Sequence, residues 1–288
     1  MNHKKIINYY CLDILLSINF DLLLKNIELD TFIHQKNKKY KKYNKIINYI
    51  IENNICKNYI IDEIFNFHET SKCIILKNNK IKDEILLISV SKPGNTHLES
   101  FFLNKNRLKF IPNNLSWINK DKCEIFQGIY NELFEYNFFE NIKMYIEKLS
   151  ENTIINLIGK SINGMVNIIF SYLINMIVNN KINIYSYSIC KFCNQNFIDE
   201  LEKKNNIHIN IINHEYDIIQ LLVNIYTLNF KNIILINNNI FIQNNKNKNQ
   251  DDIIKNNFKE NIFSYSIKYH YSNNFFNSLL KCLEHQML

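Results

Sequence analysis

The chain has 288 residues, of which 47% are hydrophobic, and this is enough to bury a large core in one folded unit. Its 34 Lys and Arg residues outnumber its 27 Asp and Glu residues, so the formal net charge is a modest +7. This excess favours anionic surfaces only weakly, and no nucleic-acid-binding motif accompanies it, so we expect no nucleic-acid partner. No segment offers the roughly 20 uninterrupted apolar residues that a membrane-spanning helix needs.

Two features bear on the cellular compartment. The amino-terminal apolar stretch is interrupted by Asp13 and Asp21, which argues against a secretory signal peptide. The seven cysteines are odd in number and scattered, as is typical of reduced thiols. Only Cys190 and Cys193 have the spacing of a metal or redox pair, and no second ligand pair accompanies them. We therefore expect an intracellular protein, soluble or peripheral to membranes, without a metal or another cofactor.

Three segments organise the chain. Residues 1–60 predict an amino-terminal helical segment that packs on or caps the rest, and residues 61–288 predict one α/β unit. Within that unit, residues 243–259 are rich in Asn and Lys and predict a surface insertion. The densest basic run, residues 36–45, is most simply a solvated face, and contact with an anionic membrane surface stays open as the alternative.

Strands and helices alternate along the chain. Residues 84–91 predict a buried strand that ends before Pro93 and Gly94. Apolar residues recur every three or four positions from Gly128 to Leu149 and predict one amphipathic helix. Further strands are expected at residues 153–158, 182–187, 207–212 and 262–267, with helices from Met165 and at 195–203. This alternation predicts an α/β fold with a mostly parallel sheet and helices on both faces.

Two of the four glycines bracket a serine at a predicted strand-to-helix turn. The run is Gly159-Lys160-Ser161-Ile162-Asn163-Gly164. A serine in such a turn presents its hydroxyl at the carboxyl edge of the sheet, and the turn needs small residues two positions before and after it. Gly159 meets the first requirement, and Asn163 meets the second only partly. A phosphate-binding loop is excluded, because Ile154 stands where that motif needs a glycine.

The residues that a nucleophilic serine needs follow in the chain. A histidine must take the hydroxyl proton, and a carboxylate must orient that histidine. Asp217 follows the strand at 207–212 by a short loop, and His270 follows the strand-like segment at 262–267. The order Ser161, Asp217, His270 is that of the α/β-hydrolase arrangement. The histidines that compete as bases are His208, His214 and His285.

Four other segments of the chain form an ordered series with the segment around Ser161. The others are Pro93-Gly94-Asn95-Thr96, Phe126-Gln127-Gly128-Ile129, residues 187–197 and residues 213–219. Together they resemble motifs of the class 3 lipase family, α/β-hydrolases that include fungal triacylglycerol lipases, over roughly residues 70–280. Ser161 and Asp217 lie 56 residues apart, and Asp217 and His270 lie 53 apart, which is similar to the family's spacing.

The resemblance implies a fold and a site. It implies an α/β-hydrolase fold with Ser161 as the nucleophile, Asp217 as the acid and His270 as the base. It further implies an oxyanion hole made by the backbone N–H groups of Ile162 and Asn95. Lipids or other esters are the implied substrates, and a lid whose apolar face lies within residues 98–103 is one reading of that segment.

The chain also departs from the family's motifs. Pro93 stands at the family's oxyanion arginine, Phe126 at its histidine and Asn163 at its glycine. Loss of one oxyanion donor costs on the order of 10²–10³ in rate, so a catalytically weak or inactive scaffold or binding protein is the alternative. Retention of all three triad residues favours the enzyme. Acyl transfer in place of hydrolysis, and the oligomeric state, stay open.

Overall fold

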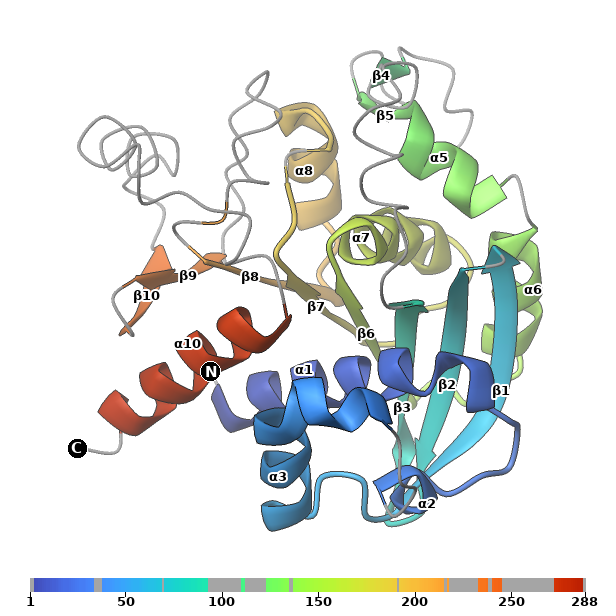
Figure 1. The fold of residues 1–288 in the computed structure, drawn as a ribbon. Helices are drawn as coiled ribbons and strands as arrows, with labels where there is room; N and C mark the ends of the chain where they lie inside the picture. Colours follow the sequence, from blue (N-terminus) through green and yellow to red (C-terminus); the bar gives the residue numbers. More distant parts are fainter. Residues whose placement is uncertain are drawn as a thin grey trace.

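A computed structural model gives the fold. It describes residues 3–33, 38–68, 70–92, 110–111, 123–134, 137–190, 192–214, 217, 233–237, 240–244 and 272–286. Within these residues, an eight-stranded sheet forms the centre of the molecule (Figure 1). Its strand order is β1-β2-β3-β6-β7-β8-β9-β10.

The sheet is parallel at its centre and antiparallel at its edges. Its strands are β1 (Tyr59–His68), β2 (Ser71–Asn78), β3 (Ile81–Ser91), β6 (Ile154–Lys160), β7 (Ile182–Tyr187), β8 (Ile207–His214), β9 (Ile233–Asn237) and β10 (Ile240–Asn244). The neighbours from β3 through β9 pair in parallel, whereas the pairs β1–β2, β2–β3 and β9–β10 are antiparallel. A separate short pair joins β4 (Phe110–Ile111) to β5 (Ile125–Phe126). The predicted mostly parallel sheet is confirmed.

Helices cover both faces of the sheet (Figure 1). One face carries α5 (Gln127–Phe134), α6 (Phe138–Ile146), α7 (Ile162–Asn175) and α8 (Gln195–Glu202). The other carries α1 (His3–Ile18), α3 (Asn44–Glu52) and α10 (Ser272–Gln286), and the short elements η1 (Phe20–Leu22), α2 (Asp30–Ile33) and η2 (Lys38–Tyr43) accompany them. Alternation along β6 explains the two cores: Ile155 and Leu157 face α7, whereas Ile158 packs in the core with α1 and α10.

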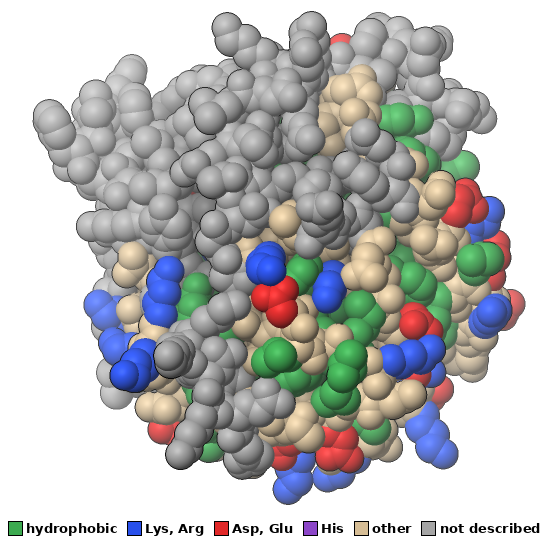
Figure 2. All heavy atoms as spheres, turned by 45° about the vertical axis from the view of Figure 1, so that its right-hand side comes forward, with side chains coloured by type: hydrophobic (Ala, Val, Ile, Leu, Met, Phe, Trp, Pro, Cys, Tyr) green, Lys and Arg blue, Asp and Glu red, His purple; other side chains and the backbone are tan. Residues whose placement is uncertain are grey.

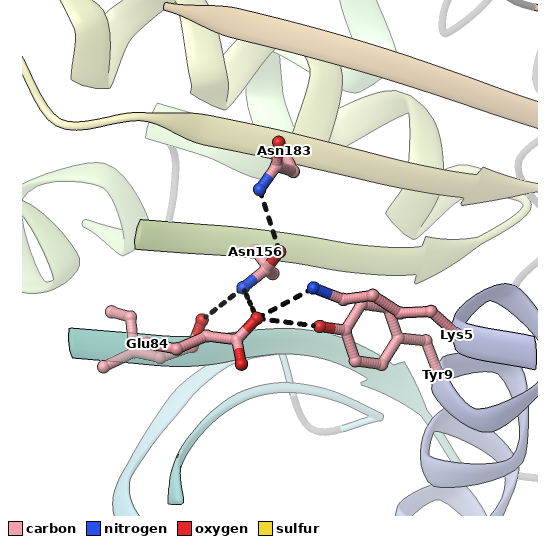
Figure 3. A network of polar contacts seen from close by, with 6 residues as sticks. Lys5, Tyr9, Glu84, Asn156 and Asn183 are labelled. Atoms are coloured by element: carbon pink, nitrogen blue, oxygen red, sulfur yellow. Dashed lines mark hydrogen bonds and ion pairs between the residues drawn. The ribbon is translucent and has the colours of Figure 1, made fainter. Parts of the chain in front are cut away.

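A polar network ties α1 to the sheet (Figure 3). Oε1 of Glu84 accepts hydrogen bonds from Lys5 Nζ at 2.9 Å, Tyr9 Oη at 3.1 Å and Asn156 Nδ2 at 2.9 Å. Asn183 Nδ2 extends the network by donating to Asn156 Oδ1 at 3.1 Å. Glu84 pairs in register with the first residue of β6, so the network lies toward the amino ends of the parallel strands, away from Ser161.

Two sequence predictions of local structure are wrong. The single helix predicted from Gly128 to Leu149 is two helices, α5 and α6. Asn137, directly before α6, has a φ of 53°, which belongs to the left-handed region and cannot continue a helix. The insertion predicted at 243–259 begins too early, because Gln243 and Asn244 belong to β10 and pair with β9. The rest of that insertion, and the strand predicted at 262–267, lie outside the described residues.

Candidate active site

Ser161 occupies the tight turn between β6 and α7. Its φ of 56° and ψ of −125° lie in a region that residues other than glycine rarely adopt. The residue is 6% exposed, and its Oγ has no hydrogen-bond partner among the described residues. The backbone is held in place, because the Ser161 N–H donates to the Tyr187 carbonyl at 2.8 Å. A strained backbone with a buried, unpaired hydroxyl is costly, and such features concentrate at functional sites.

Both glycines around Ser161 are required by close approach. A Cβ on Gly159 would lie 2.8 Å from the backbone carbonyl carbon of Asn163. A Cβ on Gly164 would lie 2.8 Å from Ile189 Cγ2 and 2.9 Å from the Gly159 oxygen. Asn163 itself fits in the turn and donates from Nδ2 to Ser91 Oγ at 3.0 Å. The second tight position of this turn is therefore Gly164, one residue beyond the position that the sequence pattern indicates.

Serines from the flanking strands fix the start of α7. Ser89 of β3 donates to Asn167 Oδ1 at 2.8 Å, and Ser186 of β7 donates to the Gly164 carbonyl at 3.0 Å. Ile162 is the first residue of α7, so its backbone N–H has no partner within the helix. An N–H group in that position can stabilise an anion beside Ser161.

Asp217 lies just beyond β8. It is fully buried, and its backbone N–H donates to the His214 carbonyl at 3.0 Å. Burial raises the pKa of the Cys190 thiol, and the negative charge of Asp217 adds to that shift. The same charge acts to raise the pKa of Lys160. The last residues of β6, β7 and β8 are paired in register, Lys160 with Tyr187 and Tyr187 with Ile212. Ser161 and Asp217 therefore belong to the same edge of the sheet, with the end of β7 between β6 and β8.

Lys160, the residue before Ser161, interacts electrostatically with Asp13 of α1. Burial lowers the pKa of Lys160, and the charges of Asp13 and Asp217 oppose this shift. Burial likewise raises the pKa of Asp13, which is 3% exposed, and the charge of Lys160 opposes that shift. Each charge thus compensates for the burial of the other.

The competing histidines differ in surroundings. His214 is buried in β8, and its Nε2 lies 3.2 Å from Ser278 Oγ of α10. Burial lowers its pKa to about 4, while the charge of Asp217 acts in the opposite direction, so the ring is neutral near neutral pH. His208 lies exposed on β8, and His285 lies in α10. Within the described residues, His214 contacts α10 and is not hydrogen-bonded to Ser161.

Several predicted site residues cannot be placed. Asn95, His270 and the lid segment 98–103 lie outside the described residues. Sequence reasoning in turn overlooked Asp13 and two residues at the ends of β7 and β8. Ser188, with a φ of 51°, follows β7. Asn213 of β8 holds Ile189 by accepting from its N–H at 3.0 Å and donating to its carbonyl at 3.2 Å. Ser188 and Asn213 share one sequence signal, because each is a polar residue directly after a predicted strand.

Other features of the described residues bear on ligands and surfaces. All seven cysteines are free and buried. Within the described ranges, no group of three or more His, Cys, Asp or Glu residues could hold a metal ion. In the same ranges, no helix is long and apolar enough to cross a membrane. Figure 2 shows basic and acidic side chains interspersed on one described face. Lys25–Glu63 and Lys92–Asp21 are two of the ion pairs among the described residues.

Comparisons with known proteins bear on the fold. The sequence matches no protein-family model and no curated protein. The structure is similar to that of a fungal lipase, with 9% identity, a TM-score of 0.62, and coverage of 93% of this chain and 94% of the other. The Rhizomucor miehei lipase in its propeptide complex has 10% identity, a TM-score of 0.60, and coverage of 93% and 79%. The lipase from Rhizopus microsporus var. chinensis has 12% identity, a TM-score of 0.59, and coverage of 93% and 85%. The chain therefore has the α/β-hydrolase fold of the fungal lipases, as the sequence motifs predict.

Proposed function

We propose that this protein is a serine hydrolase that cleaves carboxylic esters of lipids, with Ser161 as the nucleophile, Asp217 as the acid and His270 as the base. The observation that carries the proposal is the state of Ser161. It has a φ of 56° and a buried hydroxyl without a hydrogen-bond partner among the described residues, at the turn between a central parallel strand and a helix. Two glycines that tolerate no Cβ and three serine or asparagine hydrogen bonds maintain this turn.

The chemistry follows the usual two steps of acyl transfer to water. His270 takes the proton of Ser161 as Oγ attacks the ester carbonyl, and Asp217 stabilises the imidazolium. The tetrahedral intermediate collapses when the alkoxide leaves with the proton from His270. Water then attacks the acyl-enzyme with His270 again as the base, which releases the acid and restores Ser161. The backbone N–H groups of Ile162 and Asn95 are the proposed donors to the oxyanion.

The substrate class rests on the fold. The similar solved structures are of fungal lipases, over more than three quarters of each chain. We therefore propose a lipid ester as the substrate. The identity of the acyl chain and head group is a matter for a substrate screen.

Labelling by a fluorophosphonate probe tests the proposed nucleophile. We expect the wild-type protein to be labelled once, and Ser161→Ala and His270→Ala to lose the label. Asp217→Asn should label on the order of 10⁴-fold more slowly. Ser171→Ala is a matched control, because Ser171 is also buried in the strand–helix unit but its hydroxyl only donates to the Ile168 carbonyl at 2.6 Å.

Hydrolysis of emulsified triacylglycerol and of soluble short-chain nitrophenyl esters separates a lipase from a general esterase. Turnover of either substrate that survives Ser161→Ala would contradict the proposed nucleophile. A folded wild-type protein that neither labels nor hydrolyses any ester would favour the alternative, a hydrolase fold used as a scaffold or binding protein. Circular dichroism and thermal unfolding of each variant establish that it is folded.

A further inference from the structure

Ser91, the last residue of β3, lies beside the turn that holds Ser161. The strands β3 and β6 are parallel neighbours, and Ser89 pairs in register with Gly159. Two residues further along each strand, Ser91 comes level with Ser161. Asn163, the second residue of α7, reaches across to β3, because its Nδ2 donates to Ser91 Oγ at 3.0 Å. The end of β3 and the first turn of α7 are therefore in contact next to the proposed nucleophile.

Alternation along β3 directs the Ser91 side chain to the face of the sheet that α7 covers. Ile85 and Leu87 belong to the core on that face, and Ser89 donates to Asn167 of α7. Ser91 continues this series, but unlike Ser89 it is only partly buried. Ser91 is therefore the member of the series that a bound substrate can contact.

The Ser91 hydroxyl has a hydrogen left to donate. A serine hydroxyl carries one hydrogen and two acceptor lone pairs. Ser91 Oγ uses one lone pair to accept from Asn163, and among the described residues its other contact is with Ser71 Oγ at 3.4 Å. That separation is well above the usual O–H···O distance of about 2.7–2.8 Å, and Ser71 can be the donor in it. The hydrogen of Ser91 is thus available to a ligand.

The β3 side of Ser161 is the side on which donors to an oxyanion gather. In the sheet, β3 lies on one side of β6, whereas β7 and β8, which lead to Asp217, lie on the other. The proposed donor, the N–H of Ile162, belongs to the same first turn of α7 that contacts Ser91. An oxyanion held between this turn and the end of β3 would receive a backbone N–H from one and a hydroxyl from the other.

We propose that Ser91 is a further catalytic residue, whose hydroxyl donates a hydrogen bond to the oxyanion that forms when Ser161 attacks the ester. The inference rests on the proposed function and deepens it. As Ser161 Oγ bonds to the carbonyl carbon, the π electron pair of the C=O bond moves to the oxygen, and Ser91 stabilises that charge without giving up its proton. Because this charge is absent from the bound ester, loss of the hydroxyl lowers kcat and leaves KM nearly unchanged.

Removal and retention of the hydroxyl test this role. We expect Ser91→Ala to lower kcat for a soluble ester, and the rate of fluorophosphonate labelling, by about 10²-fold, with KM changed by less than about twofold. Ser91→Thr keeps the hydroxyl and should retain most of the wild-type rate. The matched control is Ser71→Ala, which removes the neighbouring hydroxyl on β2 and should leave kcat unchanged.

A tetrahedral inhibitor separates stabilisation of the oxyanion from binding of the substrate. Boronic acids add to a nucleophilic serine as tetrahedral anions and so resemble the intermediate. We expect Ser91→Ala to weaken binding of a boronic acid by about the factor by which kcat/KM falls, and Ser71→Ala to leave it unchanged. Thermal unfolding of each variant establishes that it is folded.

The possible outcomes distinguish the two proposals. A folded Ser91→Ala variant with the kcat and the boronic acid affinity of the wild type overturns the role of Ser91 and leaves the proposed function intact. A Ser91→Thr variant as slow as Ser91→Ala, or an equal loss in Ser71→Ala, also overturns it, because the loss then follows packing and not the hydroxyl. A wild-type protein that neither labels nor hydrolyses an ester overturns both.

Discussion

Asp13 of α1 and Lys160, the residue directly before Ser161, form an oppositely charged couple. Burial disfavours the charged form of each, and the charge of the other opposes that effect. The couple links a residue near the amino terminus to the turn that holds the proposed nucleophile. α1 is thereby connected to the site electrostatically as well as by packing and by the hydrogen bond from Tyr187 Oη to the Ile6 carbonyl at 2.7 Å.

The first prediction concerns this couple. At pH 7.5, between the pKa of Asp13 at about 7 and that of Lys160 at about 8, Asp13→Asn and Lys160→Met should each lower the free energy of unfolding, because each removes the charge that compensates for the burial of the other. The double variant should be more stable than the sum of the single effects by about 1 kcal/mol or more, as measured by urea unfolding. Combining Asp13→Asn with Lys45→Met, an exposed lysine on α3, provides the additive control. Additive effects for Asp13 and Lys160 as well would show that the charges do not interact.

The second prediction concerns acid stability. The pKa of His214 is about 4 in the folded protein against an ordinary value of 6.5. Between these values the unfolded chain binds more protons than the folded one, so stability falls as the pH falls from 6.5 toward 4. The contribution of this one group to that loss is about 3 kcal/mol. His214→Asn should flatten the dependence of the unfolding free energy on pH in this range, and His208→Asn should flatten it less, because the exposed His208 ring loses less hydration on folding. An unchanged slope in His214→Asn would contradict the burial of a neutral ring.

The third prediction concerns the turn at Ser161. Gly159→Ala and Gly164→Ala should each lower the free energy of unfolding by about 1–3 kcal/mol or more, because the added methyl meets backbone or packed atoms at 2.8–2.9 Å. The same variants should label slowly with a fluorophosphonate even where they remain folded. Asn163→Ala loses only the hydrogen bond to Ser91 and should be affected less. An equal loss of stability and labelling rate in all three variants would show that the close contacts at the two glycines do not determine the turn.

The fourth prediction concerns the network at the opposite end of the sheet. Glu84→Ala removes the acceptor shared by Lys5, Tyr9 and Asn156, and it should lower the free energy of unfolding by about 1–3 kcal/mol. Glu84→Gln retains an oxygen acceptor and should cost less. Because the network lies away from Ser161, folded Glu84→Ala should keep the labelling rate of the wild type. A lower labelling rate in a folded Glu84→Ala variant would show instead that this network influences the turn at Ser161.

Local pattern explains what could be predicted about the central unit. The strands β6, β7 and β8 and the turn at Ser161 come from short apolar runs, a bracketing glycine and a helix-forming stretch, all of which are contiguous in the chain. The same kind of pattern was misleading between Gly128 and Leu149, because three-to-four spacing persists across the left-handed Asn137 that separates two helices. The hairpin of β1 and β2, at an antiparallel edge, has no glycine or proline between its strands to signal the turn.

The sequence by itself determined the order of strands and helices at the centre of the chain and the turn that contains Ser161, because these depend on residues close together along the chain. Only the tertiary structure decided that Asp13 compensates the charge of Lys160, that His214 is buried against α10, and that Ser188 lies at the end of the strand between β6 and β8. Each of these depends on distant segments meeting across the sheet. Electrostatic and hydrogen-bond energies follow distance in space and burial, and neither is written in residue spacing.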